Sequence, residues 1–398
     1  MKNRELIDQK LKQAVAILDE LDIDVWLTFA RESVMLPDPV LDLILGLSVT
    51  WHSAFLITRN GPNIAIVGRY DADNIRNLDI YDEVIGYDKG IAKHLVRAIE
   101  QLNPRNIALN YSTNDVASDG LSHGNYLNIV NYLKDTVYAG RFISAEDVVS
   151  ALRGRKTALE IERVQEAIRL TETLIDQLEP SFRPGLKQRQ IAAMFQNQID
   201  IQDLGYAWDK PYNPIVTCGP ESLIGHAAPG DVALKRGDTL HIDVGIKADE
   251  YCSDIQRMWY VLEDGESEAP EDVQHAFQTV LAALRAGEQA LKPGKAGWEV
   301  DEVARETIVS AGYPEYMHAF GHLLGRSAHD GATILGPRWE RYVGLCDRLI
   351  ESGNIFTLEL HVPVKGRGIM SLEEDVLVQD DGVQYLSTPQ IELRYISP

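Results

Sequence analysis

The sequence predicts a mixed protein of two domains, a smaller α/β domain over residues 1–151 and a larger α+β domain over residues 152–398. Three observations predict this class. A chain of 398 residues is longer than one ordinary hydrophobic core supports. Helical and strand patterns alternate along the first part of the chain, whereas the second part shows a helix, helix and strand-pair order twice. The segment LRGRKTA, residues 152–158, marks the expected boundary.

The first domain opens with a charged amphipathic helix over residues 1–21. DIDVWLTF (22–29) and RNIALNYS (105–112) are strand-like, and SAFLITRNGPNIAIVG (53–68) predicts two strands around an Asn-Gly-Pro turn. GIAKHLVRAIEQL (90–102) has helical spacing. This region has no phosphate-binding glycine motif and no dense cluster of titratable residues, so we expect a structural or dimerising domain.

Composition excludes several classes of partner. The formal net charge of -22 disfavours nucleic acid and anionic membranes, which bind basic surfaces. The start of the chain has no signal-peptide core, and the apolar run VLDLILGL is far shorter than a membrane span. Three widely spaced cysteines indicate a reducing compartment without a disulfide framework. We therefore expect a cytoplasmic protein.

The second domain repeats one pattern. A long helix from Ala158 is followed by FRPGLKQRQIAAMF (182–195) and two strands within residues 239–262. A helix from Glu271 is followed by LKPGKAGWEVDEVA (291–304) and two strands within residues 355–380. An Arg-Pro-Gly or Lys-Pro-Gly turn precedes the second helix of each half. This order predicts two similar halves that face each other across a shared cleft.

Each predicted strand pair carries two acids. A turn centred between Ala248 and Asp249 would place Asp243 opposite Asp254, with Cβ atoms about 4.5–5.5 Å apart. A turn centred on Gly366 would place Glu359 opposite Glu373 in the same way. Like charges at this distance are destabilising unless a cation lies between them. Both pairs could instead face solvent, but their recurrence in equivalent hairpins favours metal.

Four carboxylates match the charge of two divalent ions about 3.5–4 Å apart. A histidine ligand would shift the preference from magnesium or calcium to manganese, cobalt, iron or zinc. HAFGHLLGRSAHD (318–330) supplies three candidate histidines, His318, His322 and His329.

These segments resemble the pita-bread metallopeptidases, which include methionine aminopeptidase, aminopeptidase P and prolidase. The resemblance covers about residues 152–390 and rests on DVGIKADEYCSDIQR, HAFGHLLGRSAHD, GNIFTLEL and LEEDVLV, in the family's order. The junction LRGRKTALEIERVQEA resembles prolidase, aminopeptidase P and creatinase, whose N-terminal domain methionine aminopeptidase lacks. The resemblance implies a pita-bread domain with a pseudo-twofold repeat over residues 152–398, and a creatinase/prolidase-type domain over residues 1–151.

The resemblance also assigns roles residue by residue. It implies two divalent ions, manganese first among the candidates, held by Asp243, Asp254, His322, Glu359 and Glu373. Asp254 and Glu373 match the positions that bridge both ions, and Glu359 is also placed to act as general base. His226, His318 and His329 match the histidines that contact substrate and stabilise the transition state. Members with such an N-terminal domain are usually homodimers.

The implied activity is hydrolysis of the bond between an N-terminal residue and proline in a small peptide, with prolidase favoured over aminopeptidase P. The chain departs from the family at Leu360, where Pro-Gly is usual, at Ala319, where Gly is common, and at Ser371, where Arg is common. The last departure keeps the longer-peptide alternative open. Lyase chemistry on this scaffold and a non-enzymatic binding protein are further alternatives, although binding proteins of this fold typically lose ligands.

Overall fold

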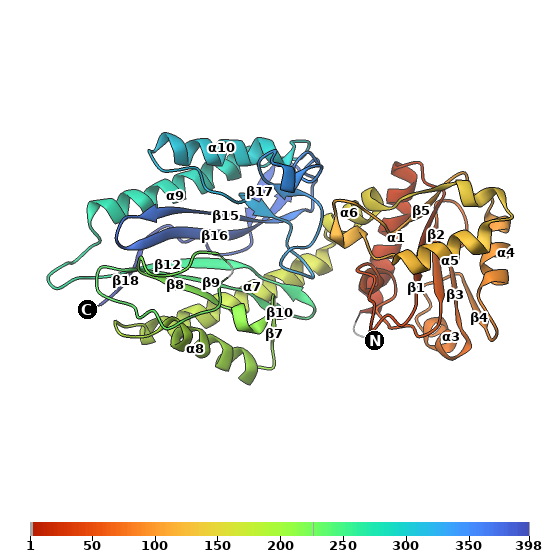
Figure 1. The fold of residues 1–398 in the computed structure, drawn as a ribbon, viewed down its shortest axis with the longest axis horizontal. Coiled ribbons are helices and arrows are strands. Elements are labelled where there is room, and N and C mark those ends of the chain that lie inside the picture. Colours follow the sequence, from red (N-terminus) through yellow and green to blue (C-terminus); the bar gives the residue numbers. More distant parts are fainter. Residues whose placement is uncertain (1–2, 226, 398) are drawn as a thin grey trace. The chain divides into compact units, whose positions relative to one another are not determined.

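The computed structural model describes residues 3–225 and 227–397 and divides into two compact units, Met1–Arg153 and Gly154–Pro398 (Figure 1). Each unit buries apolar side chains of its own, so each has its own core. No helix in the described part of the chain is long and apolar enough to cross a membrane.

The first unit is built on a six-stranded mixed sheet in the order β4-β3-β2-β1-β5-β6. Its strands are β1 Val25–Ala30, β2 Ser53–Thr58, β3 Ile64–Gly68, β4 Glu83–Tyr87, β5 Ile107–Leu109 and β6 Phe142–Ser144. The β1–β2 and β2–β3 pairs are antiparallel, and the other pairs are parallel. The strands predicted within residues 22–29 and around the Asn-Gly-Pro turn are confirmed as β1, β2 and β3.

Helices cover both faces of this sheet because alternate strand residues point to opposite sides. Trp26 and Phe55 pack in one apolar cluster with side chains of α1 (Arg4–Glu20) and α6 (Glu146–Gly154). Leu27 and Phe29 pack in the other with side chains of α4 (Ala92–Leu102) and α5 (His123–Leu133). The helices of this unit are α1 Arg4–Glu20, α2 Leu41–Ile44, α3 Arg69–Arg76, α4 Ala92–Leu102, α5 His123–Leu133 and α6 Glu146–Gly154. The predicted helix at residues 90–102 is confirmed as α4.

The second unit contains a seven-stranded sheet with the central order β15-β16-β12-β9-β8, to which β17 and β18 add. Its strands are β8 Ile215–Cys218, β9 Thr239–Val244, β12 Ile255–Val261, β15 Ile355–Val364, β16 Gly368–Gln379, β17 Gly382–Tyr385 and β18 Arg394–Ile396. Small sheets join β7 Gly205–Tyr206, β10 Ile246–Ala248 and β11 Tyr251–Cys252, and pair β13 Gly321–His322 with β14 Ile334–Leu335. Short 3₁₀ turns are η1 Val116–Ser118, η2 Val137–Gly140, η3 Glu179–Ser181, η4 Lys210–Tyr212 and η5 Glu340–Tyr342.

Two pairs of helices flank this sheet. Helices α9 Glu271–Ala290 and α10 Gly297–Ser310 lie beside β15 and β16, and α7 Ala158–Leu178 and α8 Gln188–Ile201 lie on the opposite side of the unit (Figure 1). The capping box at Thr157 and Glu160 fixes the start of α7, since each side chain accepts a backbone N–H of the other residue.

The predicted internal repeat is present in the second unit. Gly185 and Gly294, the glycines of the two Pro-Gly turns, both have positive φ, at 91° and 84°. Their N–H groups donate to equivalent carbonyls, Leu234 O and Ile350 O, each at 2.8 Å. Just before the first long strand of each half, Asp238 and Asn354 accept the N–H of the residue three positions earlier. The two halves therefore share local bonding as well as element order.

Candidate metal centre

One face of the large sheet carries a line of polar side chains. In β15, Leu358, Leu360 and Val362 are fully buried and pack with α9 and α10, so Glu359 and His361, which alternate with them, point to the other face. The same alternation applies to β9, where Leu240, Ile242 and Val244 are fully buried. The polar residues that this face brings together are His241 and Asp243 of β9, Gln256 of β12, Glu359 and His361 of β15, and Ser371 and Glu373 of β16.

In the second hairpin, Glu359 lies directly opposite Glu373, as the sequence predicts. The ladder runs without interruption from Ile355–Leu377 to Val364–Gly368. Gly366 occupies the turn with a φ of 75°, a left-handed conformation that glycine adopts without strain. A regular hairpin with a glycine turn therefore delivers an opposed pair of carboxylates.

In the first hairpin, the predicted register is wrong by two residues. Asp243 lies opposite Gln256, not Asp254. The turn is formed by Asp249 and Glu250. Their φ values of 45° and 72° are both positive, as the type I′ turn of a two-residue hairpin loop requires. Asp254 falls at a break between β11 and β12, diagonal to Asp243. The two carboxyl groups still line the same chamber.

His322 reaches these acids from the short strand β13. A Cβ atom on the preceding Gly321 would lie 2.0 Å from the carbonyl oxygen of Thr357, so only glycine lets β13 approach β15 this closely. The N–H of Glu359 donates to Phe320 O at 2.7 Å and ties the two segments together. His322 Nε2 then lies 3.7 Å from Glu359 Oε1 and 3.9 Å from Asp254 Oδ2.

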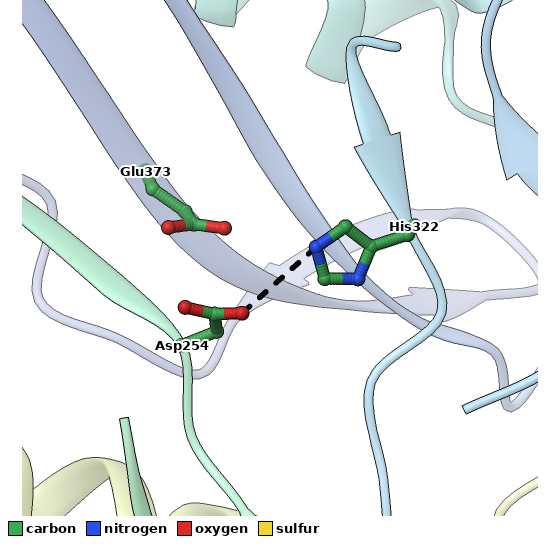
Figure 2. A group of neighbouring side chains, drawn as sticks. All are labelled: Asp254, His322 and Glu373. Atoms are coloured by element: carbon green, nitrogen blue, oxygen red, sulfur yellow. Dashed lines mark ion pairs between the residues drawn. The ribbon is translucent and has the colours of Figure 1, made fainter. Parts of the chain in front are cut away.

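These separations suit a shared cation. Two atoms that each lie about 2.1 Å from one ion are at most about 4.2 Å apart. The separations of 3.7 and 3.9 Å from His322 Nε2 fall inside this limit. The ligand atoms of Asp254, His322 and Glu373 all lie within 4.8 Å of one another, and Figure 2 shows the two carboxylates facing each other beside the imidazole ring. His322 Nδ1 is 3.4 Å from Leu323 O, an orientation that leaves Nε2 as the nitrogen that faces the acids.

The electrostatics of this cluster are unfavourable without a cation. Burial and the charge of Glu359 raise the pKa of Asp243 to about 8. Burial, followed by the charges of Asp243 and other acids, raises the pKa of Asp254 well above its ordinary value. Burial and the charge of Asp254 do the same to the pKa of Glu373. Bound cations reverse this penalty, because they favour the ionised form.

The residues present fit a metal site. Asp243 Oδ1 and Glu373 Oε2 are buried and have no hydrogen-bond partner within the described chain. A buried oxygen without a partner normally costs about 1–3 kcal/mol, more when charged, so such atoms need an explanation. Four carboxylates and one imidazole around the same cavity are the donor set that manganese, cobalt, iron or zinc accepts. All five line one chamber of about 440 Å³.

The other sequence-predicted histidines divide between two chambers. His329 lines the first chamber, with its ring centroid 4.2 Å from that of His322 in an edge-on arrangement. The loop that carries it is held by a buried ion pair between Lys156 and the neighbouring Asp330, at 2.9 Å. His318 lines a second, adjoining chamber. His226 lies outside the described residues.

Sequence reasoning missed His241, Gln256 and His361. Gln256 Nε2 donates to Glu359 Oε2 at 2.9 Å, and its Oε1 lies 2.9 Å from His241 Nε2. His361 Nδ1 lies 3.1 Å from His318 Nε2. Burial is the main reason that the pKa values of His241 and His361 are lowered to about 4, so both rings are neutral. His241 and His361 could have been found from the sequence, since each lies two residues from a candidate ligand and therefore on the same face of its strand.

Comparisons with known proteins agree with this geometry. The signature of Metallopeptidase family M24 matches residues 162–380. The candidate dipeptidase YkvY of Bacillus subtilis (strain 168) is 29% identical over 320 residues, 80% of this chain and 81% of its own. The Xaa-Pro dipeptidase of Pyrococcus furiosus is 27% identical over 267 residues, 67% of this chain and 72% of its own. The crystal structure of the X-Pro aminopeptidase from Thermotoga maritima MSB8 superposes with a TM-score of 0.71 at 25% identity, covering 97% of this chain and 99% of that one.

The family match spans both acid hairpins and the histidine segment, and the structural match extends over both units. The second unit has the pita-bread fold that the motifs predict, and the family implies divalent metal ions. On this evidence the chain belongs to metallopeptidase family M24 and is a peptidase.

Proposed function

We propose that this protein hydrolyses the peptide bond between an N-terminal residue and a proline in the second position. The observation that carries the proposal is the convergence of four acids and one histidine on one cleft, from two equivalent hairpins and a third strand. Relatives named as an Xaa-Pro dipeptidase and an X-Pro aminopeptidase support the substrate class.

The metal ligands in this proposal are Asp243, Asp254, His322, Glu359 and Glu373, and the site takes two divalent ions, with manganese favoured and cobalt, iron or zinc as alternatives. Bound ions of this kind lower the pKa of water toward neutrality and polarise a carbonyl group. Asp254 and Glu373, which lie on opposite hairpins, are proposed to face both ions.

Glu359 is the proposed general base. Its two oxygens have different surroundings, since Oε2 accepts the N–H of Gln256 and Oε1 faces His322. The amide thus holds the carboxylate in one orientation and leaves one oxygen to accept a proton in the cleft. His329 and His318 are proposed to contact the substrate, one from each chamber, and the role of His226 in substrate contact stays a prediction.

Two finer choices belong to the same proposal. The sequence favours a dipeptidase. An aminopeptidase that acts on longer peptides is the second candidate, because Ser371 supplies no cation at the position where Arg is common in the family. A lyase and a non-enzymatic binding protein on this fold are the further alternatives. Detection of peptide hydrolysis would reject both. We also propose that residues 1–151 form a creatinase/prolidase-type domain and that the protein acts as a homodimer.

The test is a panel of Xaa-Pro dipeptides and tripeptides assayed with manganese, cobalt, iron and zinc after chelation. We expect metal-dependent release of the N-terminal residue, and the His322→Ala variant should lose both metal and activity. His329→Ala should instead retain metal and lose turnover. Full activity of His322→Ala after chelation and metal addition would contradict the ligand assignment.

A further inference from the structure

A second chamber adjoins the metal-site chamber and has a volume of about 590 Å³. The two chambers share Ile215, Asp243 and Glu359, so a substrate bound at the acids would extend into both. The wall of the second chamber is formed by β8, β9, β12, β15 and β16, together with Ile224, Gly225 and the segment before β13. Its polar side chains are Thr217, His241, Gln256, Glu315, Tyr316, His318, His361 and Ser371, in addition to the shared acids.

The hydrogen-bond donors of this wall are directed at the wall itself. Gln256 Nε2 donates to Glu359, so Gln256 Oε1 is an acceptor and receives the Nε2–H of His241 at 2.9 Å. The Thr217 hydroxyl then donates to His241 Nδ1, at 3.3 Å. The Ser371 hydroxyl has two acceptors within reach, Gln256 Oε1 at 2.5 Å and Leu360 O at 3.1 Å.

Three further donors are also occupied. The Tyr316 hydroxyl donates to Asp301 Oδ1 at 3.2 Å. His318 Nδ1 lies 2.8 Å from Ala319 O, which can only accept, so this nitrogen carries the proton and Nε2 accepts from His361 Nδ1. His361 Nε2 is left as an acceptor on the wall. The chamber therefore exposes hydrogen-bond acceptors to a ligand, whereas most of its donors already bond to other groups of the protein.

The charges of the lining point the same way. Among the described residues that line either chamber there is no lysine or arginine, whereas Glu315 contributes an acid to the second chamber besides Asp243 and Glu359, which are proposed to hold the ions. Away from those ions, a carboxylate in this chamber would be desolvated beside Glu315, without a cationic side chain and with few free donors, which is unfavourable. An amide N–H would instead meet acceptors.

We infer that the second chamber receives an uncharged part of the substrate that carries an N–H group and excludes a free carboxylate. Resting on the proposed hydrolysis of Xaa-Pro bonds, this inference specifies the substrate class. The preferred peptide has its proline carboxyl group joined in an amide or a further peptide bond, and the free dipeptide is the poorer substrate. The inference therefore reverses the preference for a dipeptidase that the sequence motifs indicate and puts the second candidate, an aminopeptidase, first.

The first experiment compares Ala-Pro with Ala-Pro amide as substrates of the manganese-loaded full-length protein. We expect kcat/KM to be at least about tenfold higher for the amide, because only the free acid brings a carboxylate to a wall without a cationic side chain. Equal or faster hydrolysis of the free acid overturns the inference while leaving Xaa-Pro hydrolysis intact. Hydrolysis of neither peptide overturns the proposed function instead.

A binding measurement tests the chamber independently of turnover. Isothermal titration calorimetry with the two reaction products should show tighter binding of prolinamide than of proline, by about tenfold or more. Tighter binding of proline would overturn the inference even if no peptide is hydrolysed.

A matched pair of variants locates the effect. Ser371→Arg introduces a cation into the wall and should reverse the preference in favour of Ala-Pro. Ser371→Met has a side chain of comparable length without charge and should retain the preference for the amide. Retention of the amide preference by a folded Ser371→Arg protein would overturn the assignment to this wall. If that variant does not fold, the wild-type substrate and product comparisons still decide the inference.

Discussion

The two acid hairpins of the second unit reach the same result by different routes. In β15–β16, an unbroken ladder sets Glu359 directly opposite Glu373. In β9–β12, the position opposite Asp243 is an amide, Gln256, and the second acid, Asp254, comes from a break in the strand. The difference teaches that the duplicated halves conserve the location of the acids without conserving the register that places them. The first hairpin uses the freed position to hold Glu359 through Gln256.

The largest expected effect comes from neutralising one acid in each hairpin. Asp254→Asn and Glu373→Gln each remove a charge that is proposed to face both ions. We expect both variants to lose at least about 10²–10³-fold in kcat, as removal of a preorganised charged or polar group does elsewhere. Metal content measured by elemental analysis should fall in both. Normal metal content in one variant alone would show that the two hairpins do not contribute equally.

A smaller effect should follow from Gln256, the residue that distinguishes the first hairpin. Gln256→Glu keeps the shape but replaces the N–H donor with an oxygen that repels Glu359. We expect a loss of about 10- to 100-fold in activity or metal affinity, the range for groups that orient metal ligands. Gln256→Asn is the control, since it keeps the amide but shortens its reach. An unchanged Gln256→Glu enzyme would show that the hydrogen bond does not position Glu359.

The break at Asp254 can be tested through Gly245. A Cβ at this position would lie 2.4 Å from Ser253 O and 2.5 Å from the Trp208 ring, so Gly245→Ala requires a backbone shift. We expect a loss of about 1–3 kcal/mol in the free energy of unfolding, measured by denaturant titration. Gly366→Ala in the turn of the second hairpin meets no atom within 4 Å and should cost only the strain of its positive φ.

The last prediction concerns the pH dependence of the stability of the metal-free protein. The pKa of Asp243 in the folded state is raised to about 8 from its ordinary value of 3.8, so the folded state binds more protons than the unfolded state between these values. The free energy of unfolding should therefore fall as pH rises through this window. Thermal melts of the chelated protein from pH 5 to about pH 9 should show a decline of several degrees. Asp243→Asn should flatten the decline, and added Mn²⁺ should oppose it.

The contrast between the hairpins also explains what the sequence could predict. The order of elements, the repeat and the register of β15–β16 follow from local patterns, because Gly366 marks the turn. The register of β9–β12 does not, because Asp249 and Glu250 adopt positive φ without a glycine to reveal it. His241 and His361 are separated by 120 positions in the chain, and their common wall depends on how distant strands pair. No local pattern encodes such a meeting.

One consequence concerns the amide of Glu359. Its hydrogen bond to Phe320 O crosses between β15 and the segment that leads through Gly321 to His322. Local separation of these two segments would expose this N–H to solvent and displace the imidazole from the acids in a single event. Hydrogen–deuterium exchange at this one position therefore reports how often the cluster opens. If Mn²⁺ slows this exchange, the ratio of the exchange rates without and with the ion gives the free energy by which the ion stabilises the closed cluster.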